Sequence, residues 1–402
     1  MSCSVFVLVL IFILSKHTDK TLLLATHYYM TSHSQVTSIH TRNMPHHKDM
    51  ANILSPMADS SVMHFKKFKE QVHSQRKNTG RELTRFLETI WLFTESDIKT
   101  ILAPSVLFAL TNGIALSLLL PESAGIPSPS EILARIPVIT VYVWINLMVL
   151  CIQNQKSPDA VEEDRINKPT RPLPSGKVSS DEAGTLLVAF IIIAVLGSYC
   201  LGAPVESILV IVLGYIYNDL EGAEHPFFKN VLNSLGIPCF PIGALQVAIN
   251  PAPHTAAALA GSGPSVPLLL WRWILVLVAA IFFTIHIQDI KDQEGDACRN
   301  RKTVPLFYGD SAGRWLVVVP LLAWSVALPI LWGFTSPTAA SLLGHAPLLL
   351  LALVVSARTF LYKSVAADKK TFKIYCLWLI AMYCLPLSRA LLGGEGLMLV
   401  TA

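Results

Sequence analysis

Long apolar runs separated by short polar loops recur from Ile101 almost to the end of the 402-residue chain. The hydrocarbon core of a bilayer is about 30 Å thick, and an α-helix needs about 20 apolar residues to cross it. The runs are continuously apolar and lack the alternation of barrel strands, so they predict an all-α integral membrane protein. About nine transmembrane helices are expected, near residues 101–121, 137–153, 183–201, 204–217, 237–252, 267–288, 314–333, 343–362 and 373–393.

The composition supports this fold class and excludes others. Hydrophobic residues make up 52% of the chain and charged residues 14%, and the mean hydropathy is +0.52. No basic stripe is interleaved with aromatic residues, so nucleic acid is not a predicted partner. The seven cysteines form no CxxC pair, which indicates free thiols rather than a zinc site or a disulfide framework.

The N-terminal segment, residues 1–85, differs from the rest of the chain. It starts with the short apolar run "MSCSVFVLVLIFIL", which lacks a basic flank and a small-residue cleavage site, and continues as a polar stretch without periodicity. We expect this segment to be mostly disordered and residues 86–402 to form the transmembrane domain.

Positive charges are concentrated in alternate loops. The loops after the second, fourth, sixth and eighth spans carry most of the lysine and arginine residues. The positive-inside rule therefore places these loops and the N-terminal segment in the cytosol. A multi-pass protein of the endoplasmic reticulum is expected, with the lipid bilayer as its environment.

Two acidic stretches end the second and sixth spans: "NQKSPDAVEED" at 154–164 and "DIKDQEGD" at 289–296. Both are predicted on the cytosolic side, at equivalent places in two successive groups of four helices. We therefore expect two pseudo-repeated four-helix units around a central cavity, with one acidic loop from each unit.

The second acidic stretch predicts a cation site. Asp289, Asp292 and Asp296 have i, i+3 and i+7 spacing, which on a helix places three carboxylates on one face. Such like charges repel one another unless a cation binds between them. Carboxylate oxygens suit Mg²⁺, which completes its shell with water and phosphate oxygens.

Basic residues follow both acidic stretches: Lys168 and Arg171 after the first, and Arg299, Arg301 and Lys302 after the second. Carboxylates for a metal beside such groups describe a diphosphate site. Because the site borders apolar helices that could hold an isoprenoid chain, the residues indicate an enzyme that ionises a prenyl diphosphate.

The two motifs, "NQKSPDAVEEDRINKPTRPLPSG" and "DIKDQEGDACRNRKTVPLFYG", resemble the aspartate-rich motifs of the UbiA superfamily of intramembrane prenyltransferases. The second fits the pattern DxxDxxxD. The first departs from NDxxDxxxD, because Gln155 replaces the first Asp and Pro158 interrupts a straight helix. The resemblance implies metal ligands among the following residues, with Asp164 the first choice in the first motif: Asn154, Asp159, Glu163, Asp164, Asp289, Asp292 and Asp296. Of these, Asp164 and the three aspartates of the second motif are the predicted catalytic residues.

A third polar stretch, "YNDLEGAEHPFFKNVLN" (217–233), resembles the family's third polar loop. Together with the basic residues above, it completes the predicted diphosphate-binding set: Lys168, Arg171, Tyr217, Lys229, Asn233, Arg299 and Lys302. The resemblance covers roughly residues 88–393, and the stretch 89–104 is similar to fungal members in particular.

The altered first motif most resembles the fungal secondary-metabolism branch, which contains membrane-bound terpene cyclases. We therefore expect Mg²⁺-dependent ionisation of farnesyl or geranylgeranyl diphosphate followed by cyclisation, and the sequence leaves protein partners open. A prenyltransferase with an aromatic or meroterpenoid acceptor is the alternative, and a secondary transporter is a remote one. Aromatic residues of the spans are candidates for stabilising cations: Tyr142, Trp144, Phe282, Phe283, Tyr375 and Trp378.

Overall fold

The computed structural model describes residues 81–120, 125–250, 268–336 and 338–393. All regular secondary structure in these residues is helical, and from Leu87 onward they belong to one compact unit. Residues 1–80, which make up most of the predicted N-terminal segment 1–85, lie outside the described residues.

Seven helices of the described residues are long and apolar enough to cross a membrane: Arg81–Leu119, Ile136–Gln155 (α6), Ser180–Leu201 (α8), Pro226–Ile249 (α10), Leu270–Ile290, Asp310–Leu331 (α16) and Ala339–Leu361 (α17). Val365–Tyr383 (α18) and Leu385–Leu392 (α19) form a bent pair that makes an eighth. Pro204–Asn218 (α9) is apolar but only 15 residues long. Each expected span overlaps one of these elements.

The long first helix contains Glu95–Asp97 (η1, a 3₁₀ turn), Ile98–Leu102 (η2, a π turn) and Ala103–Leu119 (α4). The stretch Leu270–Ile290 is likewise composed of most of Leu268–Thr284 (α12) and all of Ile287–Ile290 (α13). Short helices lie between the long ones: Pro129–Ala134 (α5), Pro158–Asn167 (α7), Gly222–Glu224 (η4), Gln293–Cys298 (α14) and Val304–Tyr308 (α15).

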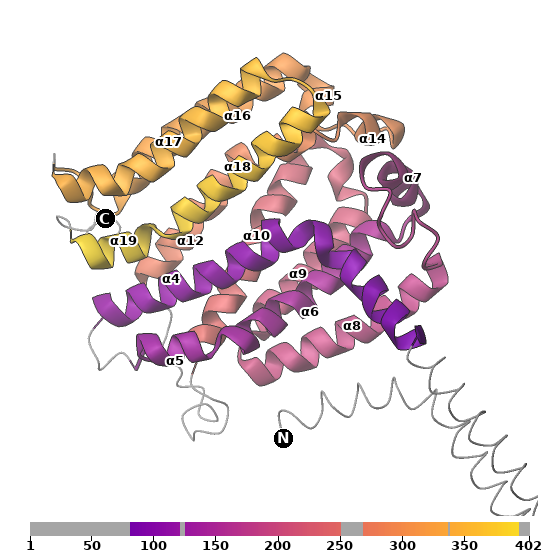
Figure 1. Cartoon of the computed structure of the whole chain (residues 1–402), viewed down its shortest axis with the longest axis horizontal. Coiled ribbons are helices and arrows are strands. Elements are labelled where there is room, and N and C mark those ends of the chain that lie inside the picture. Colours follow the sequence, from indigo (N-terminus) through magenta and orange to yellow (C-terminus); the bar gives the residue numbers. More distant parts are fainter. Residues whose placement is uncertain (1–80, 121–124, 251–267, 337, 394–402) are drawn as a thin grey trace, which may run out of the picture. The chain divides into compact units, whose positions relative to one another are not determined.

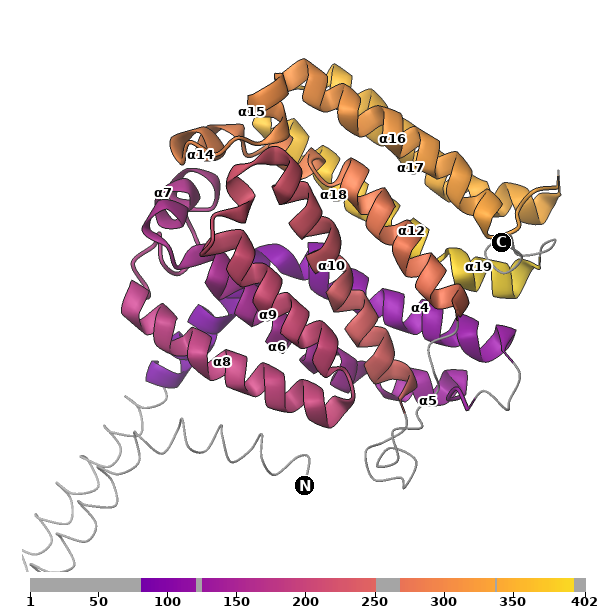
Figure 2. The same cartoon turned by 180° about the vertical axis from the view of Figure 1, so that it is seen from behind.

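Helix α10 occupies the centre of the bundle and packs against α4, α6, α9 and α12 (Figure 1). Helices α16, α17 and α18 pack in succession along one edge, and α8 lies at the opposite edge (Figure 2). Val188, Ile192 and Leu196 of α8 are exposed at i, i+4, i+8 spacing. Such an exposed apolar stripe is what a lipid-facing helix presents.

The first acidic stretch turns away from its span because of Pro158. Helix α6 ends at Gln155, and the Ser157 side chain then caps α7 by accepting a hydrogen bond from the Ala160 amide at 3.3 Å. Pro158 takes the first position of α7, where its missing N–H does no harm. The carboxylates of this stretch therefore lie on a separate short helix.

The second acidic stretch is also broken, which corrects the expectation of three aspartates along one helical face. Helix α12 ends at Thr284, α13 ends at Ile290, and α14 begins only after Asp292. The break brings α14 against α7, and the two short helices lie side by side at one end of the bundle (Figures 1 and 2). The two acidic stretches thus meet, although most of each lies on a separate short helix beyond the end of its span.

The third polar stretch is mostly helical rather than a loop. Helix α10 begins at Pro226, eleven positions before the expected span at 237, and the His225 side chain accepts a hydrogen bond from the Phe227 amide at 3.3 Å. Lys229 and Asn233 therefore lie one helical turn apart on the first turns of α10 and face the same side.

Candidate active site

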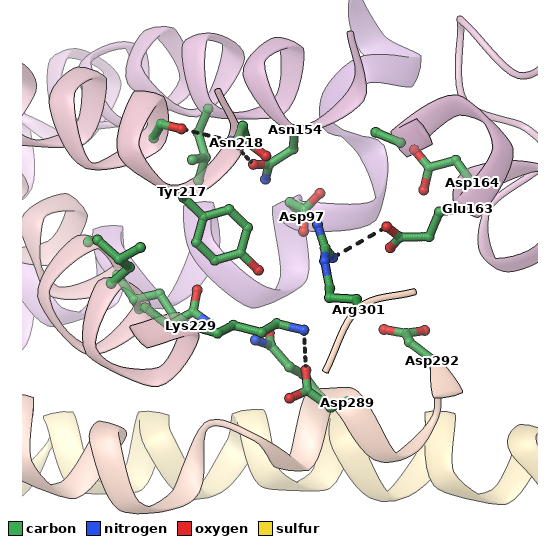
Figure 3. A pocket seen from close by; sticks show the side chains of 18 of the residues that line it. Asp97, Asn154, Glu163, Asp164, Tyr217, Asn218, Lys229, Asp289, Asp292 and Arg301 are labelled. Atoms are coloured by element: carbon green, nitrogen blue, oxygen red, sulfur yellow. Dashed lines mark hydrogen bonds and ion pairs between the residues drawn. The ribbon is translucent and has the colours of Figure 1, made fainter. Parts of the chain in front are cut away.

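A cavity of about 200 Å³ opens where the two acidic stretches meet. Charged side chains of α7, α13, α14 and the first turns of α10 line it, and together they are called its polar end (Figure 3): Glu163, Asp164, Lys229, Asp289 and Asp296. Apolar side chains from η2, α6, α9 and α10 also line the cavity, and together they are called its apolar end: Ile101, Leu150, Val210, Leu213, Leu232, Ile237 and Phe240. The cavity therefore suits a molecule with a charged head and an apolar tail.

Lys229 lies between two carboxylates of the second acidic stretch. Its Nζ is 2.8 Å from Asp289 Oδ1 and 3.9 Å from Asp296 Oδ2 (Figure 3). All three side chains are almost fully buried, with at most 4% of each exposed. A buried ammonium group between two carboxylates keeps the metal-free cavity close to electrical balance.

Arg171 holds the first acidic stretch. Its Nη1 donates to both Asp164 oxygens, at 3.1 and 2.8 Å, and its Nη2 lies 3.3 Å from Asp97 Oδ2. Both oxygens of Asp164 therefore accept hydrogen bonds from one nitrogen of Arg171, which fixes the orientation of this carboxylate in the metal-free cavity.

Arginines from the loop after α14 join the two acidic stretches. Nη1 of Arg299 lies 3.5 Å from Glu163 Oε2. Nη1 of Arg301 lies 3.3 Å from the same oxygen (Figure 3). Arg301 Nη1 is also 3.5 Å from Asp296 Oδ1, and its guanidinium lies 5.9 Å from the centre of the Tyr217 ring. The polar end thus has guanidinium groups on two sides.

Burial and neighbouring positive charges shift the pKa values of the loop carboxylates in opposite directions. It raises the pKa of Asp296 to about 6, and it also raises the pKa of Asp164, although Arg171 opposes this change. Burial acts in the same direction on Asp292, but the charges of Lys291 and Lys168 outweigh it, so the pKa of Asp292 lies below its ordinary value. A cation that binds the ionised carboxylates would favour their deprotonated forms.

The donor set fits Mg²⁺. Oδ2 of Asp289 and Oδ2 of Asp296 are buried and have no hydrogen-bond partner within the described residues. No group of three His, Cys, Asp or Glu side chains in this part of the chain is arranged to hold a metal without further ligands. Mg²⁺ typically takes one or two carboxylates together with substrate phosphates and water, so these residues suit it.

The structure brings most of the predicted site residues to this cavity: Asn154, Glu163, Asp164, Lys168, Arg171, Tyr217, Lys229, Asn233, Asp289, Asp292, Asp296 and Arg299. Asp159 and Lys302 are exposed and do not line it. Asp159 lies on the first turn of α7, on the side away from Asp164 and the buried Ala160. Lys302 follows the buried Arg301, and its amide donates to the Glu224 carbonyl oxygen at 3.2 Å.

Several lining residues were not predicted as site residues, among them Asp97, Asn167, Asn218 and Gln288. Asn218 donates from its side chain to Asn154 Oδ1 at 2.7 Å and so orients a predicted ligand. Asn218 belongs to the polar stretch 217–233, and this place in the sequence is the signal that could have identified it.

The six aromatic candidates lie outside the lining of this cavity, and Tyr217 and Phe240 are the aromatic residues of the described chain that line it. Trp378 donates to Ser325 Oγ at 2.8 Å, Trp144 donates to Thr94 Oγ1 at 3.3 Å, and Tyr375 shares a hydrogen bond with Thr284 at 2.9 Å. These interactions indicate packing roles between helices.

Comparison with known proteins identifies the family. The sequence profile of the UbiA prenyltransferase family matches residues 123–382, which is more than half of the chain. The chain belongs to the UbiA prenyltransferase family. The resemblance inferred from the two aspartate-rich motifs is thereby confirmed.

Two UbiA-related fungal proteins align with much of the chain. Fumagillin beta-trans-bergamotene synthase af520 of Aspergillus fumigatus is 28% identical over 321 residues, covering 78% of this chain and 96% of its own. Diterpene cyclase eriG of Hericium erinaceus is 27% identical over 261 residues, covering 63% of this chain and 76% of its own. A solved structure of a digeranylgeranylglyceryl phosphate synthase has a TM-score of 0.48 and 15% identity. The match covers 75% of this chain and 98% of that structure's chain.

Gly295 offers a test of the contact between the two UbiA motifs. A Cβ at this position would lie 2.6 Å from Asn167 Cγ, so alanine must displace an amide that lines the cavity. We expect Gly295→Ala to lower the rate of diphosphate release by about ten- to a hundredfold, because small displacements of catalytic groups have large effects. Gly184→Ala is the matched control, since nothing lies within 4 Å of the added Cβ. Equal rates for both variants would contradict a tight contact between α7 and α14.

Proposed function

We propose that this chain binds a prenyl diphosphate in the cavity, ionises it with Mg²⁺ and cyclises the resulting carbocation, as a membrane-bound terpene cyclase. The observation that carries the proposal is that one cavity is lined both by charged side chains and by a set of apolar ones. A diphosphate needs the cationic side chains and a metal, whereas an isoprenoid chain needs the apolar surface.

In this proposal the chain's own residues stabilise the leaving group. The bond between C1 and the bridging oxygen breaks, and its electron pair leaves with the diphosphate. Lys229, Arg299 and Arg301 face the polar end and stabilise the negative charge that develops there. Bound Mg²⁺, for which Asp289 and Asp296 are the proposed ligands with Asp292 and Asp164 as further candidates, would supply Lewis-acid stabilisation of the same charge.

The apolar end determines what captures the cation. A double bond of the same chain attacks C1 when the tail is folded back, and loss of a proton then forms a new double bond. Phe240 and Tyr217 line the cavity and are the proposed aromatic groups for stabilising cationic intermediates. The apolar lining keeps water from the cation, which would otherwise be quenched as an alcohol.

The similarity to a bergamotene synthase and a diterpene cyclase supports cyclisation over transfer to an acceptor. The alternative is a prenyltransferase, which the family name itself describes. The remote transporter hypothesis has no support from these relatives. In this proposal, residues 86–402 form the catalytic domain, with nine spans in two pseudo-repeated units. The protein resides in the endoplasmic reticulum, and its acidic loops face the cytosol.

Product analysis tests the proposal. Membranes containing the chain would receive Mg²⁺ and farnesyl or geranylgeranyl diphosphate without an acceptor, and the extract would be examined by gas chromatography–mass spectrometry. We expect a cyclic hydrocarbon from one of the two substrates, absent with the Asp292→Ala variant. A well-expressed protein that forms no hydrocarbon, but releases diphosphate when an aromatic acceptor is added, would favour the prenyltransferase instead.

A further inference from the structure

The first long helix departs from α geometry just where it passes the cavity. Its regular winding gives way to a 3₁₀ turn at Glu95–Asp97 and a π turn at Ile98–Leu102, and α-helix resumes at Ala103. Asp97 and Ile101 of this irregular stretch line the cavity. Single π turns inside helices often mark functional positions, because they change which side chains face inward.

Asp97 makes a set of contacts that connects it to the first acidic motif. Its Oδ2 accepts hydrogen bonds from Ser96 Oγ at 2.7 Å and from Arg171 Nη2 at 3.3 Å. Lys168 and Lys291 contribute further positive charge around it. Asp97 therefore places a carboxylate among cationic groups that the diphosphate is proposed to use.

The two terminal nitrogens of Arg171 are divided between two carboxylates. Nη1 contacts both oxygens of Asp164, whereas Nη2 contacts Asp97 and Ser96. If Asp164 turns toward a cation, Arg171 loses the partner of Nη1 but keeps the partner of Nη2. Nη1 then becomes available to the diphosphate while the guanidinium remains fixed.

We propose that Asp97 is a positioning residue that anchors Arg171 through Nη2, so that Nη1 can exchange Asp164 for a substrate phosphate. The inference rests on the proposed binding of a prenyl diphosphate in this cavity but does not depend on whether the chain is later cyclised. It adds the first helix, which contains neither aspartate-rich motif, to the diphosphate site.

Binding measurements separate this role from a structural one. The probe is farnesyl thiolodiphosphate, whose C–S bond resists ionisation, titrated into purified protein in the presence of Mg²⁺. We expect Asp97→Asn to weaken binding about tenfold, as the loss of one charge-assisted contact would, and to raise KM more than it lowers kcat. Asp97→Glu retains the charge and is expected to recover part of the affinity. Glu95→Gln removes an exposed charge from the same 3₁₀ turn and should change nothing.

A double-mutant cycle with Arg171→Lys tests the coupling directly. If Asp97 acts through Arg171, Asp97→Asn should have little further effect on probe binding in the Arg171→Lys background. The inference would be overturned if Asp97→Asn lowered probe affinity equally in the wild-type and Arg171→Lys proteins, or if Asp97→Asn bound the probe as tightly as wild type. The proposed function would remain intact in either case. A wild-type protein that does not bind the probe would overturn both.

Discussion

Asp296→Asn is expected to lower the rate of Mg²⁺-dependent diphosphate release at least about a hundredfold, the size of effect seen when one charge-stabilising group is removed from an active site. Asp296 is buried beside Lys229 and Arg301, and its Oδ2 has no hydrogen-bond partner within the described chain. Asparagine has nearly the same shape but lacks the charge needed to hold a cation. Diphosphate release from farnesyl and geranylgeranyl diphosphate, measured across a range of Mg²⁺ concentrations, checks this.

Glu294 provides the control for that experiment. It lies two residues away on α14 but is exposed and does not line the cavity. Glu294→Gln removes the same charge from the same short helix, and its rate should remain within about twofold of wild type, as for ordinary surface substitutions. A similar loss in both variants would mean that the net charge of the loop matters, rather than one carboxylate at the polar end.

Lys229→Met is expected to destabilise the metal-free protein. Added Mg²⁺ is expected to restore part of the lost stability. Removing the ammonium leaves Asp289 and Asp296 buried and close together, and breaking a buried ion pair typically costs about 3–5 kcal/mol. A cation bound between the carboxylates would restore the balance of charge. Thermal unfolding in detergent, with EDTA or with Mg²⁺, should therefore show a larger metal-dependent rise in Tm for the variant than for wild type.

Lys177→Met is the matched control for the stability measurement. Lys177 pairs with Glu88 at 2.5 Å, but both side chains are largely exposed. Exposed ion pairs contribute about 0–1 kcal/mol, so the Tm should change little and should not depend on the metal. An equal response to Mg²⁺ in Lys229→Met and wild type would show that the cation does not bind beside Asp289 and Asp296.

The chemistry of the cavity was predictable because its carboxylates and basic residues occur in two compact motifs. Residue type and spacing sufficed to propose a cation and a diphosphate around Asp289 and Asp164, and the family inferred from those motifs is confirmed. Pro158 was also a reliable sign that the first motif leaves its span, because proline cannot continue a hydrogen-bonded helix interior. The roles of the individual site residues stay predictions.

Spacing alone could not decide which side chains face the cavity. The spacing of Asp289, Asp292 and Asp296 fits a single helical face. The helix is interrupted at Asp292, however, and the positions of these carboxylates depend on how α13 and α14 pack. Asp159 satisfies the acidic pattern of its motif yet points to solvent. Asp97 is distant in sequence from both motifs, and the irregular turns that direct it inward have no clear sequence signal.

The most direct test of the central claim is to detect a divalent cation in the cavity together with a diphosphate. Mn²⁺ would replace Mg²⁺, and its electron paramagnetic resonance would be recorded for purified protein with and without farnesyl thiolodiphosphate. We predict that the analogue increases Mn²⁺ binding in the wild type, and that Asp289→Asn and Asp296→Asn abolish the increase whereas Glu294→Gln retains it. Analogue-dependent Mn²⁺ binding that persists in both aspartate variants, or no such binding in the wild type, would contradict the account.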